Sequence, residues 1–163
     1  MSEQADQVVS VSDAEKKKWS NNIWRYGAFK FFVDFQLWLP IWVIYLNETR
    51  GLSLTEITLL DVPFWLLLII LEVPTGIVAD RWGRKVSLCY GAAINAVAVL
   101  VFGLAGNIAI LFISYSVWAV AWTLFSGADS AFVYDSLKAA GRQDQYQKIW
   151  GRIHSISLVA HVL

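Results

Sequence analysis

Charged residues are scarce in this sequence and crowded into a few places. They make up 16% of the 163 residues, against 57% hydrophobic residues. A soluble domain of this size spreads charges over its whole surface, so the composition favours a membrane protein. The formal net charge is zero. The chain therefore offers no basic field for nucleic acid, and we expect no nucleic-acid partner.

The patterns that mark enzymes, cofactor sites and metal sites are missing as well. Cys89 is the single cysteine, which excludes an internal disulfide, and it lies in an apolar run where packing explains it. His154 and His161 lack a nearby cysteine or a suitably spaced carboxylate, so they are interpreted as packing or cavity groups. No phosphate loop, nucleophile elbow or zinc pattern occurs. We expect no enzyme, no cofactor and no metal.

Long apolar runs dominate the chain. A helix needs about 20 residues to cross a bilayer. Runs over residues 24–46, 54–79, 86–105 and 108–137 reach that length, and a fifth over 149–163 is too short. The sequence therefore predicts an all-α polytopic transmembrane bundle. Residues 1–22 are expected to be a disordered cytoplasmic tail, and residues 23–163 a partial transmembrane domain.

Several helix ends and kinks are legible in the sequence. Gly51 is typical of a helix terminator. Ser53 and Glu56 have the spacing of a capping box, which predicts the start of the second helix. A minimal turn is expected at residues 106–107. Three prolines, Pro40, Pro63 and Pro74, are expected inside the first two helices as kinks.

The cations predict the orientation in the membrane. Arg50 is the one cation on the side of the first turn, and Lys30 lies in or near the first helix. The other eleven Lys and Arg residues lie on the opposite side. Because cations gather on the cytoplasmic face, we expect the N-terminus to lie in the cytoplasm. We expect the protein to be an integral protein of the plasma membrane.

The connection between the second and third runs carries the most specific signal. Residues 76–85 read Gly-Ile-Val-Ala-Asp-Arg-Trp-Gly-Arg-Lys. A carboxylate and three cations cannot stay in hydrocarbon, so this segment marks a tight turn at a membrane face. The pattern resembles the loop between the second and third helices of major facilitator superfamily (MFS) transporters. The matching positions are Gly76, Asp80, Arg81, Gly83, Arg84 and Lys85.

This resemblance implies the first four helices and part of the fifth of an MFS transporter. Such a protein would carry out proton-coupled secondary active transport of a small solute, with two helical halves rocking around a midplane site. Its partners would be the lipid bilayer, the solute, the proton and C-terminal helices beyond this chain, which is not expected to transport alone. A non-transporting scaffold or receptor on the same helices is the alternative. MFS drug antiporters carry an arginine in the fourth helix, four residues before a glycine. Here Thr123 stands four residues before Gly127, so that arginine is absent.

Five acids are expected at membrane depth, where a charge must be paired, protonated or hydrated. They are Asp34, Asp61, Glu72, Asp129 and Asp135. Lys30 lies four residues before Asp34 and can pair with it. That pair is either structural or part of a substrate site or gate. Asp129 has no cation within a turn of its own helix, so we expect it to be the proton carrier.

The remaining acids receive gating or packing roles, or none. Glu72, Gly76 and Asp80 recur every four residues and share a helix face, on which Gly76 leaves room for a close neighbour. Glu72 is interpreted as a packing or gating residue, with proton coupling left open. The resemblance implies that Asp135 pairs with Arg84, with simple exposure to water as the alternative. Asp61 receives no role.

Overall fold

The computed structural model describes residues 13–37 and 39–162. Its elements are the helices α1 (Asp13–Asp34), α2 (Trp42–Ile44), α3 (Leu54–Trp82), α4 (Arg84–Leu104), α5 (Ile108–Ser126), α6 (Asp129–Ala139) and α7 (Tyr146–Val162), with a π-helix η1 (Tyr45–Thr49) and a 3₁₀ helix η2 (Gln143–Gln145). Every element in this part of the chain is helical, which confirms the all-α prediction. The first part of the expected tail, residues 1–12, lies outside the described residues, and from Asp13 the chain is helical.

Three helical segments are long and apolar enough to cross a membrane. Within the described residues they are Leu54–Trp82, Arg84–Leu104 and Ile108–Ala139, the last of which combines α5 and α6. Large apolar side chains are exposed along α3, among them Trp65, Ile69 and Val73. Such a surface is stable in lipid and costly in water. The chain is therefore an all-α membrane protein.

The first expected span is interrupted in the structure. The sequence predicts one helix over 24–46, but α1 ends at Asp34 and α2 begins only at Trp42. Pro40 lies in this break, where we expected a kink inside a helix. Proline lacks the N–H of the helical ladder and disfavours helical geometry in the residue before it, so a regular helix does not continue through residue 40.

The fourth expected span, 108–137, also divides. The helix α5 ends at Ser126, and α6 begins at Asp129 after a turn at Gly127 and Ala128. Glycine and serine are weaker helix formers than alanine or leucine, which makes this point easy to open. The division puts Asp129 in the first turn of α6, beside the turn, and not in mid-helix.

The sequence predicts the other helix boundaries well. The capping box is confirmed: the Ser53 backbone N–H donates to Glu56 Oε2 over 2.8 Å, and the Glu56 N–H donates to Ser53 Oγ over 3.3 Å. The Asn107 side chain accepts from the Ile110 N–H over 3.0 Å at the start of α5. Gly51 has a φ of +70°, a conformation that favours glycine, as the terminator prediction requires.

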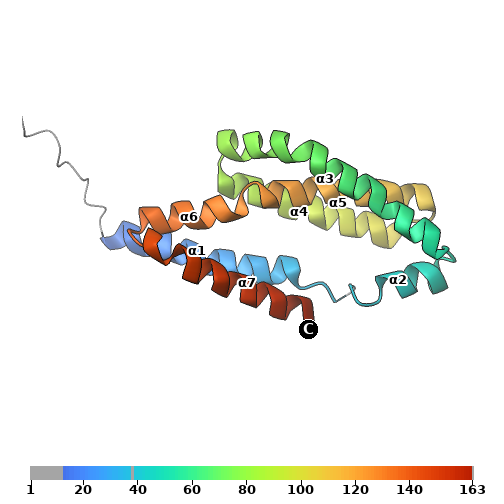
Figure 1. Ribbon diagram of the computed structural model, residues 1–163, viewed down its shortest axis with the longest axis horizontal. Coiled ribbons are helices and arrows are strands. Elements are labelled where there is room, and N and C mark those ends of the chain that lie inside the picture. The colour runs from blue at the N-terminus through green and yellow to red at the C-terminus, as the bar shows by residue number, and fades with distance from the viewer. Residues whose placement is uncertain (1–12, 38, 163) are drawn as a thin grey trace, which may run out of the picture.

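The helices form two groups that meet at one end of the molecule. Figure 1 shows α3, α4 and α5 side by side, with α1 and α7 as a second pair beneath them. The helix α6 extends the line of α5 and packs on α1 and α7. A buried cluster around Phe125, Val133 and Leu137 joins the groups at this end. A second cluster, around Leu46 and Leu60, lies at the far end of α3.

Candidate functional site

Lys30 lies between two carboxylates in the interior, where α1 meets α6. Its Nζ atom is 3.3 Å from Asp34 Oδ2 and 3.5 Å from Asp129 Oδ2. The Asp34 side chain is 1% exposed, and the side chains of Lys30 and Asp129 are each 14% exposed. The predicted pair between Lys30 and Asp34 is confirmed. The contact with Asp129 was not predicted from the sequence, because its cation lies on α1 and not on α6.

The surroundings of this triad leave its charge incompletely balanced. Ser157 of α7 donates a short hydrogen bond to Asp34 Oδ2. Asp34 Oδ1 and Asp129 Oδ1 are buried and have no hydrogen-bond partner among the described residues. Two carboxylates and one ammonium carry a net charge of −1, which is costly to bury. One bound proton makes the triad neutral, so its arrangement suits the uptake and release of a single proton.

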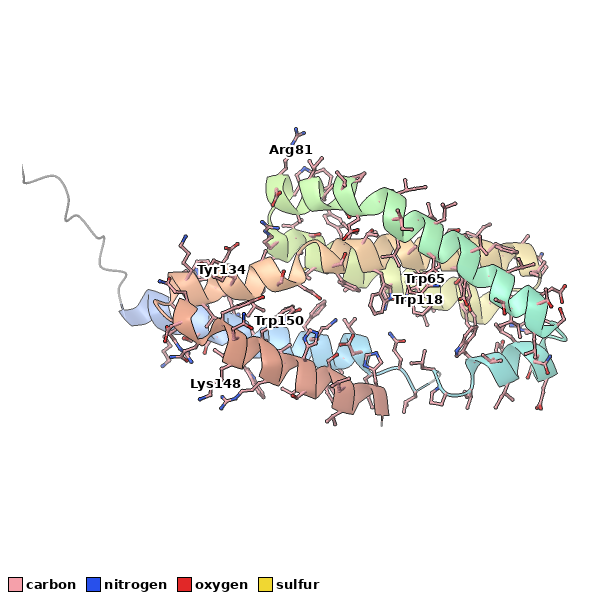
Figure 2. All side chains as sticks on the ribbon, viewed as in Figure 1. Trp65, Arg81, Trp118, Tyr134, Lys148 and Trp150 are labelled. Carbon is pink, nitrogen blue, oxygen red and sulfur yellow. The ribbon has the colours of Figure 1, made fainter. Side chains whose placement is uncertain are left out.

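A pocket of about 270 Å³ opens onto the triad. Lys30 and Asp129 line it, together with Trp122, Trp150 and His154. The rings of Trp150 and His154 lie 4.9 Å apart, and Lys30 Nζ lies 6.0 Å from the centre of the Trp122 ring. Figure 2 labels Trp150 on α7, near α1. His154, interpreted from the sequence as a packing or cavity group, is therefore a cavity group beside the triad.

The loop motif forms a compact junction between α3, α4 and α5. Arg84 Nη2 is 2.7 Å from Asp80 Oδ1, and Arg84 Nη1 donates to the Gly127 carbonyl over 3.1 Å. Gly83 joins the two helices with a φ of +95°, a conformation that only glycine adopts without strain. Arg81 and Lys85 are exposed, and Figure 2 shows Arg81 extending away from the helices.

Asp135 does not join this junction in the part of the chain that the structure describes. The resemblance implied a pair between Asp135 and Arg84, but the guanidinium contacts Asp80 instead. The local reason is spacing, since Asp80 precedes Arg84 by four residues across a tight turn. Asp135 is exposed on α6. The exposed position matches the alternative, in which this acid meets water at a helix end.

The face of α3 that carries Glu72 and Gly76 is open. The Glu72 side chain is exposed, and a Cβ added at Gly76 would meet nothing within 4 Å. The Gly76 backbone nonetheless has a close neighbour inside the chain, because a Cβ on Gly127 would lie 3.4 Å from Gly76 Cα. Next to Gly76, the hydroxyl of Thr75 lies 3.2 Å from the carbonyl oxygen of Thr123, which is one turn before Gly127. The α3–α5 contact thus depends on small residues.

Sequence reasoning missed a second and larger pocket, of about 440 Å³, which contains Asp61. Its walls are Leu39, Trp42, Phe64, Trp65, Leu68, Tyr115, Trp118 and Trp122. Figure 2 labels Trp65 of α3 and Trp118 of α5 close to each other. Spacing could have revealed these walls. Phe64, Trp65 and Leu68 follow Asp61 by three, four and seven residues, and Tyr115, Trp118 and Trp122 repeat at helical intervals.

Comparison with known proteins yields one distant similarity. The chain is 29% identical over 89 residues to the uncharacterized MFS-type transporter YxaM of Bacillus subtilis (strain 168). The matched segment covers 55% of this chain and 22% of that protein. No family model matches the chain. No solved structure matches it either.

Proposed function

We propose that this chain is the N-terminal part of an MFS-type secondary transporter. It would move a small solute together with protons or in exchange for them. The observation that carries the proposal is the buried triad of Lys30, Asp34 and Asp129. A protein that acts only as a scaffold gains little from a costly buried charge, here with two carboxylate oxygens that have no hydrogen-bond partner among the described residues. Intramembrane groups of this kind are typical of proton relays in transporters.

The proton cycle follows from the charge of the triad. With Asp129 protonated, Lys30 and Asp34 remain as a neutral pair, and Ser157 supports the Asp34 carboxylate. When Asp129 loses its proton, Lys30 is shared between two carboxylates and the triad becomes anionic. In this proposal the proton reaches Asp129 through the cavity that His154, Ser126 and Ser130 line together with aromatic rings. In this cycle Asp34 stays ionised as the counter-ion of Lys30, and it acts as a substrate contact or as part of a gate.

The junction at Arg84 fits a role in switching. Its guanidinium ties the end of α3 to the turn between α5 and α6, and that turn directly precedes Asp129. In this proposal, a change in the protonation of Asp129 acts on the α3–α4 junction through this turn. Alternating access needs a linkage of this kind between the proton site and a moving helix. The open face of α3 and the missing solute-facing helices are supplied, in this proposal, by chain beyond Leu163.

The distant match to an MFS-type transporter over 89 residues supports transport as the general activity. The rival proposal is a non-transporting scaffold or receptor. The exposed face of α3 around Glu72 could serve such a protein as a docking surface. The two differ in one measurable property. A transporter moves solute and protons across a sealed membrane, whereas a scaffold or receptor moves neither.

The test uses the protein expressed from its full reading frame and reconstituted in sealed vesicles with an internal pH dye. A panel of small solutes is added with and without an imposed pH gradient. We expect at least one solute to move protons. Asp129→Asn should abolish gradient-driven accumulation while sparing solute exchange. The exposed acid Asp144 gives the matched control, Asp144→Asn, which should behave as wild type.

Two results would count against this assignment. If no solute on the panel moves protons or exchanges, the scaffold or receptor is favoured. If Asp129→Asn keeps full accumulation and Asp34→Asn alone abolishes it, the roles of the two carboxylates are reversed.

A further inference from the structure

We propose that the pocket around Asp61 binds lipophilic organic cations that carry aromatic or bulky apolar groups. This inference rests on the proposed function, for which it names the class of solute. Its starting point is the make-up of the walls. Aromatic side chains from α3 and α5 face one another across about 440 Å³, a volume typical of small-molecule sites. Asp61 carries the one charge among the described residues that line the pocket.

Asp61 is a carboxylate without a protein partner in the described part of the chain. It is half-buried in α3, seven residues after the helix begins at Leu54, which is about 10 Å along the axis. No described cation lies within salt-bridge distance of it, in contrast to Asp34, Asp80 and Asp129. An unpaired acid on a membrane helix is costly, and a cationic ligand would remove that cost.

The aromatic rings favour the same ligand. The ring centres of Phe64 and Trp118 lie 5.2 Å apart, and those of Trp118 and Trp122 lie 6.3 Å apart. Tyr115 adds an edge-on contact at 6.1 Å from Trp118. Ring faces attract cations through their negative quadrupole, most strongly for tryptophan. An anion would meet both this negative potential and the Asp61 carboxylate, so the pocket discriminates by charge and not only by hydrophobicity.

The pocket is also separate from the proton triad. The triad uses Lys30, Asp34 and Asp129, and none of these residues lines the Asp61 pocket. Trp122 lines both pockets and forms a common wall. Lys30 itself lies outside the lining of the Asp61 pocket, on the side of the triad. The two sites can be tested independently by substitution.

The test measures binding without any gradient, on the full chain purified in nanodiscs of zwitterionic lipid. Radiolabelled tetraphenylphosphonium is the probe, and uptake by empty nanodiscs is subtracted. Radiolabelled tetraphenylborate, an anion of almost the same shape, is the matched control and is measured in separate samples, because the two ions pair when mixed. We expect saturable binding of the cation and no saturable binding of the anion. Asp61→Asn should weaken binding of the cation roughly tenfold or more, and Asp61→Glu should retain it.

Two further variants separate the site from the fold. Trp65→Leu removes an exposed ring from the wall and should weaken binding several-fold, by roughly the strength of one cation–ring contact. Asp144→Asn, an exposed acid outside the pocket, should leave binding unchanged. Circular dichroism of each variant must match wild type before its binding is interpreted. If Asp61→Asn fails this check, Asp61→Ser replaces it.

Three outcomes would overturn the inference: no saturable binding of the cation, equal saturable binding of tetraphenylborate, or full binding by Asp61→Asn. Failure of the proposed function looks different. A chain that binds the cation through Asp61 but moves no solute in vesicles retains the pocket and loses the transport proposal. A chain that transports other solutes with protons and ignores the cation retains transport and loses this inference.

Discussion

Replacing Lys30 by methionine tests the buried triad directly. The change leaves an unbranched side chain one heavy atom shorter and removes its charge, so Asp34 and Asp129 lose the ammonium that lies 3.3 and 3.5 Å from them. Removing one partner of a buried ion pair costs about 3–5 kcal/mol, because the remaining charge is left uncompensated. Here two carboxylates lose the same partner, and Asp34 is only 1% exposed. We therefore expect a loss in the upper part of that range.

The size of this effect is open to measurement in micelles. The free energy of unfolding is obtained from equilibrium unfolding with an increasing fraction of a denaturing detergent, followed by tryptophan fluorescence and by circular dichroism. A loss of about 3–5 kcal/mol lowers the ratio of folded to unfolded protein by roughly a hundredfold to a few thousandfold. Lys148→Met is the matched control. Lys148 is exposed, and Figure 2 shows its side chain pointing away from α7. Its removal should stay within about 0.5 kcal/mol.

A second substitution identifies the cause of the loss. In Lys30→Met, Asp34 and Asp129 lose the ammonium that they share, and replacing Asp129 by asparagine removes one of the two acids. Adding Asp129→Asn to Lys30→Met should therefore restore part of the stability at neutral pH. A loss below about 1 kcal/mol, or one that Asp129→Asn does not relieve, would refute the argument from buried charge.

Three further predictions concern orientation and the loop. In a Cys89→Ala background, an impermeant thiol reagent added outside should label a cysteine at position 50 and not one at position 84, and the reverse pattern would invert the proposed topology. In the full-length protein, Asp80→Asn should slow transport by about tenfold while leaving the equilibrium affinity for solute within about twofold, because neither Asp80 nor Arg84 lines either pocket. A large loss of affinity with unchanged turnover would contradict that role. Gly83→Ala should lower the free energy of unfolding by about 1–3 kcal/mol, since a φ of +95° strains any residue with a Cβ, and an unchanged stability would show that the loop adapts.

The sequence predicted those features that depend on neighbours along the chain. The capping box at Ser53, the turn at Asn107 and the pair of Lys30 with Asp34 each involve residues at most four positions apart. Their geometry follows from the helix itself. The lengths of the three membrane-spanning segments follow in the same way from continuous apolar runs.

Breaks within apolar runs were harder to predict. Hydropathy does not distinguish a continuous helix from two helices joined by a short unwound segment, because both bury the same side chains. Pro40 was expected to kink a helix, and in the structure it lies in a break of seven residues between α1 and α2. Proline can do either, and the choice depends on whether other groups satisfy the freed backbone. The turn at Gly127 is a similar case, since the Arg84 guanidinium that binds its carbonyl comes from another helix.

The difference between Asp61 and Asp129 shows why depth along a helix is a poor guide to function. Both were assessed by their distance from the ends of the expected spans and by the charges on their own helix. On that basis Asp129 lacked a cation and Asp61 lacked a role. The structure gives Asp129 a cation from α1, and it surrounds Asp61 with aromatic rings from α3 and α5. Asp34 has a cation on its own helix, but the cation of Asp129 and several of the rings around Asp61 come from other helices. The chemistry of such an acid is therefore decided by which helix faces it, and that is a property of the packing.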